Sequence, residues 1–267
     1  MAGSDSGGGA GIQADLKAFA RCGAHGMTAI TAITAQSTTG VSAVYPLPPE
    51  AIVEQVRAVA DDIGVDAVKI GMVGTADAIQ AVARSLELVD GAPVVLDPVM
   101  VAESGARLLD EDAIGALRSL LLPRASVATP NAAEAAVLAG LAPDTPPEAL
   151  ARAVHELGPG AVVVTGGDRD DAADLFYDGE RLVAIPGERY PGGAAHGSGC
   201  THSSVLAAEL AFGVDPLDAA RRAKEVAAEA VRDGLRELGA GAGPVDVFGL
   251  RREGTPARPA VERGSAV

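Results

Sequence analysis

A glycine-punctuated stretch in the last third of the chain carries the residues best suited to chemistry. It reads Ala-His-Gly-Ser-Gly-Cys-Thr over residues 195–201 and continues into an apolar run that is predicted to be helical to about Phe212. Gly197 and Gly199 allow a tight turn, and the N–H groups and positive dipole end of the new helix bind anions. Cys200 falls in the first helical turn, where a thiolate is stabilised. An anion site beside a nucleophile or base indicates acyl or phosphoryl transfer, whereas an ordinary loop-to-helix junction with a buried cysteine gives the same pattern.

A second glycine-rich stretch opens the chain over residues 3–11 and leads into an apolar pattern that predicts a helix from Ile12 to about Cys22. It does not match the dinucleotide-binding fingerprint, because Ile12 stands where the third glycine is required. It is not a Walker loop either, since Gly-Lys-Ser/Thr occurs nowhere in the sequence. A backbone-rich loop suited to closing over a small ligand is the interpretation that is left.

Apolar and β-branched runs alternate with amphipathic segments along the chain, as in a parallel α/β sheet covered on both faces. Strands are expected at 28–35, 67–70, 94–96, 127–129 and 161–164, with a hairpin over 175–185. The expected helices follow in between, the first opened by Pro48, then 76–88, 113–122, one capped by Asn131, 147–157 and 216–238.

Polar or glycine-rich residues follow these expected strands, and ligands of such sheets bind beyond the carboxyl ends of the strands. The residues at these ends are Gln36, Gly71 and Met72, Asp97, Asn131 with Glu134, and 165–167. Five such ends and one anion-binding turn predict a single cleft.

Composition limits the function classes. The chain has 267 residues, 48% of them hydrophobic, which suits one large domain or two small ones. A net charge of −15 argues against binding to nucleic acid. There is no apolar run as long as a membrane span and no signal-peptide pattern, so a cytoplasmic protein is expected. Two distant cysteines argue against a disulfide framework or a zinc site. Residues 1–250 are expected to form the domain, and 251–267 a disordered tail.

Six motifs in register resemble the hydroxymethylpyrimidine/phosphomethylpyrimidine kinases of thiamin biosynthesis, within the ribokinase-like superfamily. The likeness covers about residues 2–248. The motifs lie at residues 2–5 with 8–17, 34–38, 69–72, 97–100, 129–131 with Glu134, and 196–201. The resemblance implies a three-layer α/β/α sandwich with a mostly parallel central sheet.

The same resemblance implies an enzyme that phosphorylates 4-amino-5-hydroxymethyl-2-methylpyrimidine with ATP and Mg²⁺, and then phosphorylates the monophosphate. Cys200 would accept the proton of the substrate hydroxyl, and many relatives in the superfamily have Asp at this position. The backbone of Gly197, Ser198 and Gly199 would hold the transferring phosphoryl group, as an oxyanion hole does.

The expected substrate pocket combines polar side chains that hydrogen-bond the pyrimidine edge with apolar walls. Gln36 offers both a donor and an acceptor to an aminopyrimidine, and Asp15 is a second candidate for that edge. The expected walls are Gly3, Ala10, Met72 and Val99. Asp97 and Glu134 are the expected Mg²⁺- and phosphate-side acids, directly or through water, and the nucleotide side is completed by Asn131, Thr165 and Gly167.

The chain departs from the family at three positions and leaves alternatives open. Thr165 stands where the family usually has Lys before Gly-Gly, which removes a cation from the triphosphate. Ala195 and Ser198 stand where Thr is common. A pyridoxal kinase of the same fold is the nearest alternative, and a silent pyrimidine sensor or a hydrolase are alternatives from other classes. The expected partners are a pyrimidine and a second copy of the chain, with no nucleic acid and no membrane.

The start of the chain is short for this family, in which a buried apolar strand precedes the loop at Gly3. Only Met1 and Ala2 stand before that loop, so the first strand is expected to be truncated. Because an open sheet centre leaves backbone groups unpaired, the natural chain is expected to begin upstream.

Overall fold

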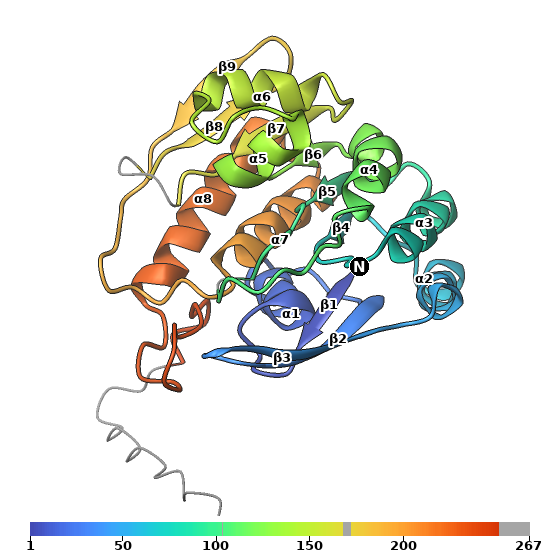
Figure 1. Cartoon of the computed structure of the whole chain (residues 1–267), viewed down its shortest axis with the longest axis horizontal. Coiled ribbons are helices and arrows are strands. Elements are labelled where there is room, and N and C mark those ends of the chain that lie inside the picture. Colours follow the sequence, from blue (N-terminus) through green and yellow to red (C-terminus); the bar gives the residue numbers. More distant parts are fainter. Residues whose placement is uncertain (103, 168–171, 251–267) are drawn as a thin grey trace, which may run out of the picture.

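Strands and helices alternate along this computed structural model, which describes residues 1–102, 104–167 and 172–250 (Figure 1). The strands are β1 Ala2–Asp5, β2 Ile30–Ser37, β3 Gly40–Pro46, β4 Val68–Ile70, β5 Val94–Leu96, β6 Val127–Ala128, β7 Ala161–Val164, β8 Asp174–Tyr177 and β9 Leu182–Ile185. The α-helices are α1 Gly11–Arg21, α2 Pro49–Asp62, α3 Ala76–Ser85, α4 Ala113–Ala116, α5 Ala132–Ala139, α6 Pro147–His155, α7 Ser198–Ala211 and α8 Pro216–Arg232.

Six strands form the main sheet in the order β4-β5-β6-β7-β8-β9. The first four run parallel, β8 pairs antiparallel with β7, and β9 pairs antiparallel with β8 and forms the edge. A smaller sheet has the order β1-β2-β3, in which β1 and β2 are parallel and β2 and β3 form an antiparallel hairpin. The expected mostly parallel sheet is therefore confirmed.

Both faces of the main sheet are buried, because alternate side chains of each strand enter different cores. Leu96 and Val162 pack in the core formed with α2 to α6, whereas Val95 and Val163 pack in the core formed with α1, α7 and α8. This period of two places helices on both faces and gives the three-layer sandwich (Figure 1). Every helix in the described ranges is too short or too polar to cross a membrane.

The first strand differs from the expectation that only two of its residues are present. Residues of the expected glycine-rich loop pair with β2 instead, so that Asp5 lies opposite Thr34. Met1 links this strand to β4, since its amino group donates to the Lys69 carbonyl at 2.7 Å and its own carbonyl accepts from the Gly71 N–H at 3.0 Å. These two bonds connect the backbone of the small sheet to β4 of the main sheet.

Three other expectations are corrected by the structure. The polar segment after residue 35 is not a loop: Gln36 and Ser37 belong to β2, and a tight turn leads into β3, which the sequence pattern did not reveal. The helix expected over 113–122 becomes a π-helical turn and then a 3₁₀ turn after Ala116, as Pro123 approaches. Helix α8 ends at Arg232 rather than near residue 238. The tail expected to be disordered, 251–267, lies outside the described residues.

Candidate active site

The turn before α7 has the geometry expected of an anion site. Gly197 adopts the left-handed conformation with φ of 86°, and α7 begins at the next residue. A Cβ atom on Gly197 would overlap the carbonyl oxygen of Gly9, so only glycine allows the turn to contact the N-terminal loop. The first-turn amides of α7, including those of Gly199 and Cys200, lie at the positive end of the helix dipole.

Asp5 organises the N-terminal loop and connects it to this turn. Its carboxylate accepts hydrogen bonds from the N–H groups of Gly7 at 2.7 Å, Gly9 at 3.0 Å and Ala10 at 2.9 Å. The same carboxylate lies 3.0 Å from Nε2 of His196, the residue before the turn. Burial alone would raise the pKa of Asp5, but the hydrogen bonds from His196 and from the loop lower it below its usual range. The two glycine-rich stretches therefore form one unit.

A buried ionic cluster lies under the turn, at the carboxyl ends of β4 and β5. Lys69 Nζ donates to Asp15 Oδ1 at 2.8 Å and lies 3.8 Å from Asp97 Oδ2. Helix α7 completes the cluster, because Ser204 Oγ donates to Asp15 Oδ1 at 2.8 Å and Ser203 Oγ donates to Asp97 Oδ2 at 2.9 Å.

Burial and the neighbouring charges shift the pKa values of this cluster. Burial alone would lower the pKa of Lys69, but the carboxylates of Asp15 and Asp97 outweigh it and raise that pKa. Burial raises the pKa of Asp97 despite the nearby ammonium group. The Lys69 side chain is only 1% exposed, so its charge acts on the buried site rather than on solvent.

Cys200 lies in the first turn of α7, as expected, but its surroundings do not stabilise a thiolate. Burial raises the pKa of the Cys200 thiol to about 12, although Lys69 and the N–H of Gly11 act in the opposite direction. The thiol of the ligand-free protein is therefore protonated at neutral pH, in contrast to the thiolate that the helix position predicts.

The nucleotide-side residues are brought together at the ends of β6 and β7. Asn131 and Glu134 form a capping box at the start of α5, with Asn131 Oδ1 accepting from the Glu134 N–H at 2.8 Å. Glu134 also accepts from the Met100 N–H at 3.3 Å, which ties α5 to the loop after β5. Thr165 lies in a bridge beside Asn131, and Gly167 is exposed at the same edge.

The two carboxylates expected to bind Mg²⁺ are both held by hydrogen bonds within the protein. Within the described ranges, no three His, Cys, Asp or Glu side chains gather as metal ligands. Glu134 accepts from backbone N–H groups, and Asp97 accepts from Ser203. Mg²⁺ in kinases keeps several waters and binds mainly to substrate phosphates, so Asp97 and Glu134 fit an ion that arrives with the nucleotide.

The expected acceptor residues surround the loop that joins β1 to α1. Gly3 lies against Met72, because a Cβ atom there would be 2.9 Å from the Met72 sulfur. Ala10 and Val99 are half-buried, as walls of a pocket would be. Gln36 lines a pocket of about 330 Å³, and its Oε1 accepts from Thr34 Oγ1 at 3.0 Å. Asp15 is directed to Lys69 and Ser204 in the interior, a role that its position in the sequence did not reveal.

A second buried ionic group connects the nucleotide side to α7 and α8. Asp174 Oδ1 accepts from Lys224 Nζ at 2.7 Å and from the Gly166 N–H at 2.8 Å, and Asp174 Oδ2 lies 3.1 Å from His202 Nε2. Burial alone would raise the pKa of Asp174, but His202 and Lys224 outweigh it and lower that pKa to about 2.

The sequence motifs include Asp5, Lys69 and His196 but indicate no role for their side chains. A lysine inside an apolar strand was the one signal that could have singled out Lys69, because a buried ammonium needs a partner. Asp5 and His196 are 191 residues apart, and no local pattern links them.

The chain is similar over most of its length to known proteins. The family model for phosphomethylpyrimidine kinase matches residues 5–246. The hydroxymethylpyrimidine/phosphomethylpyrimidine kinase of Rhizobium meliloti is 48% identical, over 93% of this chain and 95% of the relative. That of Streptomyces coelicolor is 46% identical, over 92% of each chain. The solved pyridoxal kinase from Staphylococcus aureus in complex with pyridoxal is 35% identical with a TM-score of 0.84, over 92% of this chain and 91% of that one.

The three-layer α/β/α sandwich and the glycine turn at the start of α7 define a kinase of the ribokinase-like class. The match over residues 5–246 is more specific: the chain belongs to the phosphomethylpyrimidine kinase family.

Proposed function

We propose that the protein phosphorylates 4-amino-5-hydroxymethyl-2-methylpyrimidine with ATP and then phosphorylates the resulting monophosphate. Besides family membership, the contact between Gly9 and Gly197 carries this proposal, because it joins the acceptor loop to the anion-binding turn. A bound alcohol beside this contact would be next to the transferring phosphoryl group. Phosphoryl transfer depends mainly on this kind of positioning.

The amides at Gly197, Ser198 and Gly199 hold the transferring phosphoryl group in this proposal. Cys200 takes up the proton of the acceptor hydroxyl. Its pKa is about 12 in the ligand-free protein, so only a small fraction is thiolate at neutral pH, and Lys69 favours that thiolate from the interior.

Gln36 recognises the aminopyrimidine edge through its amide, with Oε1 held by Thr34 and Nε2 directed to the ring. Gly3, Ala10, Met72 and Val99 are the pocket walls. Asp15 acts from the interior, where it accepts from Lys69 and Ser204 and so orients Lys69.

ATP is the phosphoryl donor, and the Staphylococcus aureus pyridoxal kinase is also solved in complex with ADP. On the nucleotide side we propose Asn131, Thr165 and Gly167. Asp97 and Glu134 would hold Mg²⁺, directly or through water, and the ion would supply positive charge for the phosphates.

A pyridoxal kinase is the second candidate function, favoured by the structural similarity to the pyridoxal-bound kinase. Turnover in a coupled ATP assay separates the two. We expect higher kcat/KM for the pyrimidine alcohol than for pyridoxal, followed by turnover of the pyrimidine monophosphate. Turnover of pyridoxal alone would overturn the proposal.

We propose that the protein acts as a cytoplasmic homodimer that does not bind nucleic acid. The supporting observation is an exposed apolar face on the small sheet, where Ile33 and Tyr45 lie directly opposite each other and are 48% and 61% exposed. A sedimentation experiment tests the dimer, and Tyr45→Glu should shift it to monomer. A monomeric wild-type protein would refute this part.

A further inference from the structure

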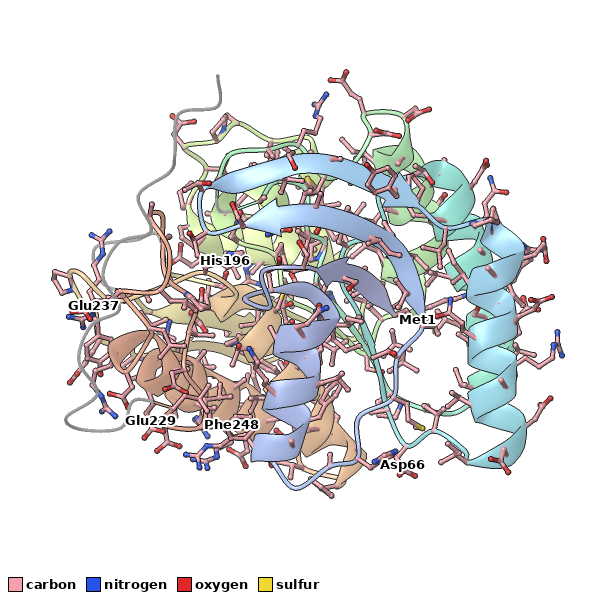
Figure 2. All side chains as sticks on the ribbon, turned by 90° about the horizontal axis from the view of Figure 1, so that it is seen from below. Met1, Asp66, His196, Glu229, Glu237 and Phe248 are labelled. Carbon is pink, nitrogen blue, oxygen red and sulfur yellow. The ribbon has the colours of Figure 1, made fainter. Side chains whose placement is uncertain are left out.

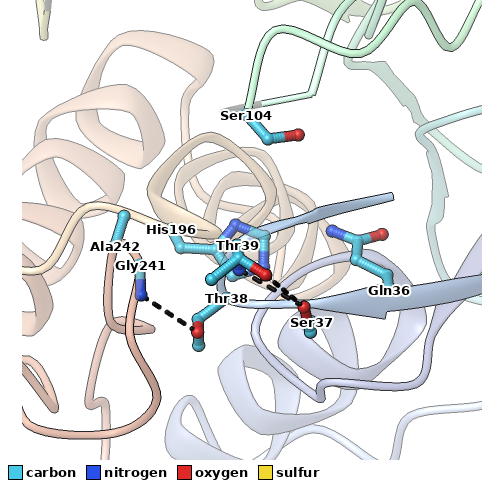
Figure 3. A pocket seen from close by; sticks show the side chains of 8 residues that line it. All are labelled: Gln36, Ser37, Thr38, Thr39, Ser104, His196, Gly241 and Ala242. Atoms are coloured by element: carbon cyan, nitrogen blue, oxygen red, sulfur yellow. Dashed lines mark hydrogen bonds between the residues drawn. The ribbon is translucent and has the colours of Figure 1, made fainter. Parts of the chain in front are cut away.

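The tip of the β2–β3 hairpin, the segment around residue 104 and the loop before residue 243 enclose a pocket of about 330 Å³ (Figure 3). Its lining residues are Gln36, Ser37, Thr38, Thr39, Ser104, His196, Gly241 and Ala242. None of these eight described residues carries a carboxylate, although the chain contains 36 acidic residues. The pocket is therefore a place where an anion meets no direct like-charge repulsion.

The pocket presents hydroxyl donors from two separate segments, the tip of the β2–β3 hairpin and the segment of Ser104. Thr38 Oγ1 accepts from the Gly241 N–H at 3.3 Å, which leaves the Thr38 hydroxyl proton to donate elsewhere. Ser37 Oγ and Thr39 Oγ1 are 3.0 Å apart and share one hydrogen bond, so one of their two protons can also be donated elsewhere. Ser104 adds a hydroxyl from across the pocket (Figure 3). Hydroxyl and amide donors suit the oxygens of a phosphate ester.

His196 forms the wall of this pocket nearest the anion-binding turn. His196 lies beside the N-terminal loop (Figure 2). Its Nε2 is 3.0 Å from Asp5 Oδ2, and a Cβ atom on Gly9 would overlap the ring. Because the ring is fixed on one side, its edge toward the pocket presents a constant position to a ligand.

The pocket therefore lies between Gln36, proposed to read the pyrimidine, and the turn at Gly197, proposed to hold the transferring phosphoryl group. We infer that it binds the phosphate of a phosphorylated acceptor, with His196 as the residue that recognises this phosphate. The inference rests on the proposed function. It means that these residues let the enzyme bind the pyrimidine monophosphate as its second acceptor.

The second transfer needs no base when this phosphate is a dianion. One of its oxygens forms a bond to the γ-phosphorus of ATP, and the bond from that phosphorus to the β–γ bridging oxygen breaks. The bridging oxygen keeps the electron pair, so that ADP leaves and a diphosphate is formed. The pocket contributes to this step by positioning the attacking oxygen.

The test compares the two acceptors in His196→Gln, with saturating ATP. The measured quantity is the ratio of kcat/KM for the monophosphate to kcat/KM for the alcohol. We expect this ratio to fall on the order of tenfold or more, mainly through KM for the monophosphate. Ser104→Ala, on a different segment, should lower the same ratio by a smaller factor. His25→Gln changes an exposed histidine that does not line the pocket. It is the matched control and should leave the ratio unchanged.

Calorimetric titration with the monophosphate alone supplies a readout that is independent of turnover. Weaker binding in both variants, with unchanged melting temperatures, supports the inference. An unchanged ratio, or equal losses for both acceptors in both variants, overturns it. If His196→Gln does not fold, Ser104→Ala with Thr39→Val decides by the same ratio. A wild-type protein that does not phosphorylate the alcohol would instead contradict the proposed function.

Discussion

Lys69 and Asp15 form an ion pair in the interior, with Nζ and Oδ1 2.8 Å apart and side chains 1% and 5% exposed. The pair joins β4 to α1 directly beneath Cys200. Buried ion pairs contribute little net stability when complete, but the loss of one partner leaves an uncompensated charge in the interior.

Lys69→Met should therefore destabilise the protein by about 3–5 kcal/mol, measured as the free energy of unfolding in urea. Adding Asp15→Leu should recover part of this loss, because the unpaired carboxylate is then also removed. Arg84→Met is the matched control: it breaks the exposed pair with Glu50 and should cost less than about 1 kcal/mol. Strictly additive losses in the double variant would contradict the pairing argument.

This pair also shows how far the sequence alone could predict the site. Asp15 was identified as functional, but the partner that fixes its direction lies 54 residues away and belongs to another element. Local patterns predicted the cap at Asn131 and the turn at Gly197, because capping and positive φ depend on neighbouring residues. The hairpin strand β3 was missed, since its half-exposed residues Gly40–Pro46 form no buried apolar run and end at a proline.

Asp174 predicts a specific dependence of stability on pH. Its pKa is lowered to about 2 in the folded protein, against about 4 in an unfolded chain. A group with a depressed folded pKa stabilises above its unfolded pKa, and this contribution is lost as the pH falls through the folded value. The contribution is therefore complete above about pH 4 and lost between about pH 4 and pH 2.

The measurement is the free energy of unfolding of wild type and Asp174→Asn across this pH range. We expect the advantage of wild type to shrink by about 2–3 kcal/mol as the pH falls from 4 to 2. A difference between the two proteins that stays constant over the range would show that Asp174 does not carry this pH dependence.

Gln36→Ala should weaken binding of the pyrimidine alcohol by about 1–3 kcal/mol, because a polar edge of the ligand loses its partner in the pocket. ATP affinity should be unchanged, since Gln36 lies on the hairpin and not at the nucleotide side. Calorimetric titration with each ligand measures both. Gln80→Ala, at an exposed position of α3, is the matched control. Equal losses of pyrimidine and ATP affinity would indicate a disturbed fold instead of a lost contact.

Cys200→Ala should separate the two phosphorylations. The alcohol must give up a proton as it is phosphorylated, so loss of the base should lower its turnover by about 10²-fold or more. The monophosphate as a dianion has no proton to lose, so its turnover should fall much less. ATP affinity should barely change, because the turn at Gly197 binds phosphate through its backbone.

The pH profile of the alcohol step checks the same role by a different observable. Burial raises the pKa of Cys200 to about 12. If the thiol keeps a raised pKa with ATP bound, the thiolate fraction and therefore kcat rise with pH between about 6 and 9, whereas the residual rate of Cys200→Ala stays flat. Cys22→Ala changes the other cysteine, which directly follows α1, and should retain the wild-type profile. Near-normal alcohol turnover in Cys200→Ala would remove Cys200 from the proton transfer and leave the backbone of the turn as the group that acts on the phosphoryl oxygens.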